Sequence, residues 1–112
     1  MKVSLQGYNS HYITLMADGD LAAGDLVQIS ANATVKKATS GKFAGIVHSV
    51  RDGFVLVQTS GYAQLGYSGA TAPVLGYNFL AAAEQGSAVN AQGREVLVVE
   101  LDPAQKRIGI LF

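Results

Sequence analysis

The sequence contains neither cysteine nor tryptophan, and it has two prolines. Without cysteine the chain can form neither a disulfide framework nor a thiolate metal site. Its 112 residues are still enough for one domain with a modest hydrophobic core. Residues 1–12 hold one lysine and no long apolar run, so we expect neither a signal peptide nor a membrane anchor there.

Charge is scarce as well. Charged residues make up 14% of the chain, against about 25% in ordinary soluble domains. Eight basic residues balance eight acidic ones, so the chain lacks the net basic footprint that nucleic-acid binding requires. With 49% hydrophobic residues, we expect part of the surface to be covered by copies of the chain or by a partner protein. We expect no nucleic-acid or membrane partner.

What the sequence does contain is a series of short apolar runs: YITLM, DLVQI, FAGIVHSV, GFVLVQT, REVLVVEL and RIGILF. Clusters of Gly, Asn, Ser and Asp separate these runs at intervals of about ten residues, which is typical of an all-β sandwich or barrel. Residues 102–105 begin with Asp and Pro and predict a turn that joins strands at 94–101 and 107–112. Residues 79–85 offer a helical alternative, but seven residues are too few for an independent helix. We therefore predict an all-β fold of short strands.

Two of the predicted strands are apolar on both faces. In residues 95–101, Leu97, Val99 and Leu101 alternate with Val96, Val98 and Glu100, and in residues 54–57, Phe54 and Leu56 alternate with Val55 and Val57. A strand that is apolar on both faces is usually covered on both faces. The second cover is either another part of the same closed barrel or a neighbouring subunit, and the pattern leaves both open.

The two halves of the chain also share a pattern. The first half contributes residues 22–38 and 43–47, and the second half contributes residues 74–92 and 94–99. Both begin with a glycine, a short strand and a polar turn. A valine-centred strand (Val35 or Val89), a glycine turn (Gly41 or Gly93) and a long apolar strand follow in the same order. Sequence identity between the halves is low, and chance similarity is the alternative explanation. A true repeat predicts two similar β units related by a pseudo-twofold axis.

Residues that could carry chemistry are few. His11 and His48 have no carboxylate or second histidine at a local metal-binding spacing, so we expect no metal site. Ser68 in GYSGA has alanine where a nucleophile elbow needs its second glycine, and SGK at 40–42 lacks the rest of a phosphate loop. The carboxylates near residues 95–102 flank an apolar strand and are expected to be solvated. We predict no catalytic residue, no cofactor and no enzymatic activity.

Tyrosine is the abundant aromatic residue, with five copies. Tyrosine is enriched at protein interfaces and is also common on strands. Because the low charge already favours a covered surface, we predict that Tyr62, Tyr67 and Tyr77 lie at an interface between subunits.

The run AGDLV, TVKKAT and GKFAGIV, followed by GFVLVQTSGYAQL, resembles the small capsid-decoration proteins of tailed bacteriophages. The C-terminal GREVLVVELDPAQKRIGILF is similar to the ends of such head proteins. The resemblance covers roughly residues 17–112 and rests mainly on turn residues. In the second half Leu75-Gly76-Tyr77 stands where the first half has Ala-Gly-Asp.

The resemblance implies a β-clip- or β-tulip-like barrel over residues 17–112, trimeric in many such proteins and docked on the outside of the phage head. Residues 1–16 would then be a flexible N-terminal arm or an edge strand that gains main-chain hydrogen bonds on a neighbouring sheet. Its apolar residues are the expected capsid contacts: Val3, Leu5, Tyr8, Tyr12, Ile13 and Leu15. Such a protein would be assembled in the bacterial cytoplasm and carried on the virion.

We thus expect a structural protein that stabilises the head by binding the major capsid protein as a homo-oligomer, preferably a trimer. A tail, baseplate or head-fibre-base module is the first alternative. The second is a small ligand-binding or enzymatic β-clip domain. That last alternative predicts a concave pocket with converging polar groups, whereas decoration predicts a flat or protruding apolar surface.

Overall fold

The computed structural model describes residues 10–69, 71–84 and 86–112, and within these ranges the protein is all-β. The predicted fold class is therefore confirmed, and residues 76–82 form a strand in place of the helical alternative. The strands are β1 (His11–Ala17), β2 (Leu26–Ala31), β3 (Thr34–Lys37), β4 (Gly45–Arg51), β5 (Phe54–Ser60), β6 (Tyr62–Ser68), β7 (Gly76–Ala82), β8 (Ser87–Val89), β9 (Arg94–Asp102) and β10 (Arg107–Leu111).

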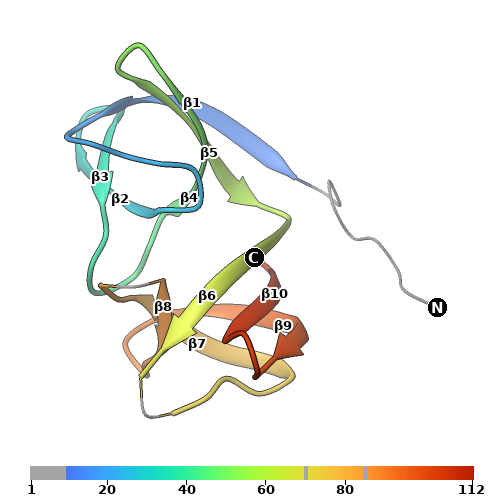
Figure 1. Ribbon diagram of the computed structural model, residues 1–112. Coiled ribbons are helices and arrows are strands. Elements are labelled where there is room, and N and C mark those ends of the chain that lie inside the picture. The colour runs from blue at the N-terminus through green and yellow to red at the C-terminus, as the bar shows by residue number, and fades with distance from the viewer. Residues whose placement is uncertain (1–9, 70, 85) are drawn as a thin grey trace.

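The strands close into two small barrels, which follow one another along the chain (Figure 1). Barrel 1 has the order β1-β3-β2-β4-β5, and barrel 2 has the matching order β6-β8-β7-β9-β10. In each, the first strand runs parallel to the third and antiparallel to the fifth. The chain thus forms two barrels rather than one, and the repeat read from the sequence corresponds to a repeated strand order.

The register corrects one detail of the sequence match. Each barrel has two parallel residue pairs, which include Ala17 with Val35 in barrel 1 and Tyr67 with Ser87 in barrel 2. Val35 and Ser87 are both fully buried, so the counterpart of Val35 is Ser87 and not Val89. A serine is tolerated there because its hydroxyl donates a hydrogen bond of 2.9 Å to the carbonyl oxygen of Gly66.

The hairpin between the fourth and fifth strands of each barrel uses a different turn type. Asp52 and Gly53 both have positive φ, 51° and 81°, as a two-residue type I′ turn between β4 and β5 requires. Between β9 and β10 the Asp102 carboxylate accepts a hydrogen bond of 3.3 Å from the backbone N–H of Gln105. This is the C-terminal hairpin predicted from the sequence, with Asp102 paired to Arg107.

The interior of barrel 1 is built from valine. Its buried cluster is Val27, Val35, Val47, Val55 and Val57, with Leu15, Ala17 and Leu21 packed against it. β-Branched side chains suit strands and fill the narrow centre of a small barrel.

The interior of barrel 2 is larger and extends into barrel 1. Its own residues include Leu80, Val96, Val98, Ile108 and Ile110, and the same cluster contains Leu26, Ala38, Phe43 and Ile46 from barrel 1. This cluster therefore joins the two barrels, whereas the valine cluster inside barrel 1 is separate from it.

Arg94 adds a polar clamp to this junction. Its guanidinium donates to the carbonyl oxygen of Ala44 at 3.3 Å and lies 4.9 Å from the ring centre of Phe112 and 5.5 Å from that of Phe43. Burial lowers the pKa of Arg94. At the same joint, Gly61 and Phe112 exchange two backbone hydrogen bonds of 2.9 and 3.1 Å, so the C-terminus fixes the link between β5 and β6.

Candidate functional site

The first half of β1 extends beyond β3 as the outer strand of a sheet in which β5 pairs with β1 on one edge and with β4 on the other (Figure 1). We call this part of β1, together with the β5 residues paired to it, the ribbon. β5 pairs with β1 from His11 to Met16, but β3 pairs only with Met16 and Ala17. Residues 11–15 therefore have a second edge on which no strand of the described chain is paired. Tyr12 and Ile13 are 44% and 48% exposed there. An open edge flanked by apolar side chains is suited to strand addition by another protein.

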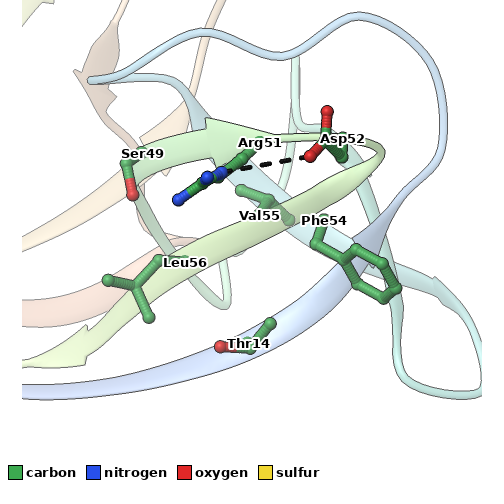
Figure 2. A pocket seen from close by; sticks show the side chains of 7 residues that line it. All are labelled: Thr14, Ser49, Arg51, Asp52, Phe54, Val55 and Leu56. Carbon is green, nitrogen blue, oxygen red and sulfur yellow. Dashed lines mark ion pairs between the residues drawn. The ribbon is translucent and has the colours of Figure 1, made fainter.

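A cleft of about 400 Å³ lies beside this ribbon, on the outward face of β1, β5 and β4. Figure 2 shows Phe54 and Leu56 on β5, with Thr14 on one side of them and Ser49 and Arg51 on the other. Phe54 is 53% exposed and pairs directly with Met16, which is exposed to the same degree. Arg51 and Asp52 form an ion pair of 3.9 Å at the rim, which contributes little because both side chains are almost fully solvated.

A second apolar surface covers the outer face of β7 and the loop before it. We call it the β7 patch; it consists of Val74, Leu75, Tyr77 and Phe79, all between 49% and 72% exposed. Tyr77 pairs with the half-buried Leu97 of β9, which in turn pairs with Leu111 of β10. The patch is thus continued by apolar side chains across two further strands.

The predicted capsid contacts are only partly described. Val3, Leu5 and Tyr8 lie outside the described residues. Tyr12 and Ile13 are on the projecting half of β1, whereas Leu15 is half-buried and packs against the valine cluster of barrel 1.

The predicted interface tyrosines lie in two different environments. Tyr77 is 72% exposed, but Tyr62 and Tyr67 are 8% and 9% exposed. Tyr67 belongs to the core of barrel 2, and the Tyr62 hydroxyl donates a hydrogen bond to the Glu100 carboxylate. This burial removes Tyr62 and Tyr67 from the surface that a neighbouring subunit can contact. Burial, and then the bond to Glu100, raise the pKa of Tyr62 above its usual value.

The residues examined for chemistry remain apart. The Nδ1 atom of His11 is 2.9 Å from the hydroxyl of Ser60, and the ring of His48 lies 5.0 Å from that of Tyr12. Ser68 ends β6, and Gly41 of SGK accepts a backbone hydrogen bond from Ala82. In the part of the chain that the structure describes, no three His, Asp or Glu side chains are grouped as metal ligands. Nor do those residues form a helix long and apolar enough to cross a bilayer.

Sequence reasoning missed Met16, Phe54 and Phe79 as surface residues. For Phe54 a signal was present, since it alternates with Val55 and Val57, which fill the barrel. For Phe79 the strand Gly76–Ala82 places Tyr77 and Phe79 outward and the buried Asn78 and Leu80 inward.

No protein-family model matches this sequence, and no curated protein matches it.

Proposed function

We propose that this protein is a structural protein that binds the outer surface of a bacteriophage capsid and stabilises the shell. The observation that carries the proposal is the projecting half of β1, which presents an open strand edge beside an apolar cleft. A strand of this kind gains main-chain hydrogen bonds when it pairs with the sheet edge of another protein. The choice of a phage shell as that surface rests on the sequence resemblance.

The cleft supplies the side-chain part of the contact. Phe54 and Leu56 offer apolar area next to the ribbon, and burying exposed apolar area stabilises an interface by roughly 25 cal/mol per Å² before the costs of association are subtracted. Many copies on one shell would act together, so each individual contact can be weak.

The β7 patch is assigned to contacts between copies of the chain, with a trimer as the preferred assembly. It lies on barrel 2, away from the ribbon and the cleft, and includes Tyr77, the predicted interface tyrosine that remains at the surface.

Two variants separate the assigned roles. Purified protein is mixed with expanded capsids from the parent phage, and bound protein is measured by co-sedimentation; saturation at a fixed stoichiometry is expected. Phe54→Ser should weaken shell binding and leave the mass in solution unchanged by light scattering. Tyr77→Ser should lower that mass. No binding of the wild type to any capsid or procapsid of that phage would refute the proposal.

A further inference from the structure

A polar groove of about 430 Å³ lies between the two barrels. We call it the junction groove. His48 of β4 and Tyr12 of β1 line it from barrel 1, and Gln64 of β6 and Arg107 of β10 line it from barrel 2. A hollow of about 200 Å³ continues it over barrel 2, since Gln64 and Arg107 line both and Glu100 and Asp102 are added there. The volume of the junction groove is in the range of small-molecule sites.

The walls of the groove are held by hydrogen bonds that are buried or partly buried. The Gln58 amide donates to the carbonyl oxygen of Tyr62 at 2.9 Å and to that of Ser60 at 3.1 Å. The Tyr62 hydroxyl donates to Glu100 and accepts a bond of 3.2 Å from the Gln64 amide. These bonds fix the side chains of Gln64 and Glu100 in advance, so these two side chains lose less entropy when a ligand binds.

Gly109 creates part of the space. A Cβ at this position would lie 2.7 Å from the Tyr62 hydroxyl and 2.8 Å from the Glu100 carboxylate. Any side chain there would displace the Tyr62–Glu100 hydrogen bond. Glycine at this position therefore preserves that bond and leaves the hollow unfilled.

Several polar groups of the groove are available to a ligand. Within the described residues, the side chains of His48 and Arg107 make no hydrogen bond or ion pair, and the His48 ring packs against the ring of Tyr12. Arg107 and the Gln64 amide supply donors, the imidazole of His48 supplies a donor and an acceptor, and the carboxylates of Glu100 and Asp102 supply acceptors. Hydroxyl groups both donate and accept, so a polyhydroxylated ligand matches this set.

The charges in the hollow favour a neutral ligand over an anion. Arg107 faces two carboxylates, Glu100 and Asp102, in the same hollow, so an anion would meet net negative charge. Tyr12 is 44% exposed and tilted at 59° to the His48 ring, which gives one wall an aromatic face for the apolar side of a sugar ring. We infer that the junction groove is a binding site for a neutral saccharide. This inference does not depend on the proposed shell binding.

The test is a titration followed by amide NMR. The full-length protein is titrated with maltose, lactose and N,N′-diacetylchitobiose in separate experiments, with glycerol as a small-polyol control and glucuronate as the anionic arm. At least one disaccharide should shift the amides of His48, Gln64 and Arg107 in a saturable way, with Kd on the order of 1 mM. Gln64→Ala and Arg107→Gln should each weaken binding by about tenfold or more.

Arg51→Gln is the matched control, because Arg51 is an exposed strand arginine outside the groove; it should leave the affinity unchanged. The unperturbed spectrum away from the groove verifies that each variant is folded. The inference is overturned if no disaccharide shifts these amides, if the shifts map elsewhere, if glycerol saturates the same amides at the same concentration, or if glucuronate alone binds there.

Discussion

The outward face of β1, β5 and β4 in barrel 1 can be compared with the matching face of β6, β10 and β9 in barrel 2. Both hairpins pair their first residues across the turn, Arg51 with Phe54 and Asp102 with Arg107. Phe54 is the first residue of β5 after its turn, and Arg107 is the first residue of β10 after its turn. Arg107 in barrel 2 therefore corresponds to Phe54 in barrel 1.

The comparison extends along the same strands. Gly109 takes the position of Leu56, since Leu56 pairs with Thr14 and Gly109 pairs with Gln64. The same backbone scaffold thus carries an apolar cleft in barrel 1 and a polar hollow in barrel 2. A repeated fold fixes where a surface depression lies, and a few outward side chains decide what it binds.

The largest expected effect comes from the difference between the two cores. Leu80→Ala in barrel 2 should lower the free energy of unfolding by about 3–4 kcal/mol, because Leu80 is fully buried in the cluster that joins both barrels. Val57→Ala in barrel 1 removes less volume and should cost about 2 kcal/mol. Chemical denaturation measures both. Equal costs, although more volume is removed at Leu80, would contradict the role assigned to the cluster that joins both barrels.

Exchanging Phe54 and its counterpart Arg107 tests the two surfaces. Phe54→Arg should weaken shell binding by about tenfold or more, a loss of roughly 1.4 kcal/mol, because a cation would replace apolar contact area. Arg107→Phe should leave shell binding unchanged and abolish disaccharide binding. Both side chains are exposed, so stability should change by less than about 0.5 kcal/mol. Shell binding that survives Phe54→Arg intact would separate the cleft from the proposed function.

Two glycines of barrel 2 sharpen the comparison further. Gly109→Ala should cost about 1 kcal/mol, because its methyl group would push apart Tyr62 and Glu100. Gly66→Ala is the control: a Cβ there has one neighbour, the carbonyl oxygen of Lys106 at 3.8 Å. That variant should be neutral or slightly stabilising, by about 0.5 kcal/mol, since it restricts the unfolded chain. Thermal unfolding of the pair distinguishes a filled hollow from a general intolerance of side chains in these strands.

The smallest expected effect is on the ionisation of Tyr62. Its pKa is raised above the usual 10.0, so the folded state holds this proton more tightly than the unfolded state does. The resulting contribution to stability is fully present below pH 10.0 and is lost as the pH rises through the folded pKa. In an absorbance titration of tyrosinate, one tyrosine should ionise late, and Glu100→Gln should shift that step toward lower pH. Titration of all tyrosines as one group would contradict the Tyr62–Glu100 bond.

Local sequence signals predicted much of this fold. The Asp102-Pro103 turn predicted the C-terminal hairpin, and the spacing of the short apolar runs predicted the all-β fold. Asp52-Gly53 is a comparable turn signal between β4 and β5, and the alternation in residues 54–57 matches the burial of the valines and the exposure of Phe54. The number of barrels was beyond such signals. Each barrel closes through a parallel pairing of just two residue pairs, as between Ala17 and Val35, and so short a contact leaves no periodicity in the sequence.

The candidate sites were less predictable than the fold. Ala63, Leu65 and Tyr67 lie at every second position of β6, so the alternation along this strand indicates the burial of Tyr67. The burial of Tyr62 was not, because its position depends on Glu100 and Gly109, which are distant in sequence. The junction groove likewise gathers residues from five strands of both barrels. Its polar lining becomes visible only when the two barrels are packed together.

The central claim is that the chain binds a larger protein surface through the projecting half of β1 and the cleft beside Phe54. A cryo-electron-microscopy reconstruction of expanded capsids saturated with the protein tests it most directly. The account predicts density in which β1 and the cleft of barrel 1 face the shell, with the β7 patch against a neighbouring copy. Density with barrel 2 against the shell and β1 in solvent, or shells without added density, would contradict it.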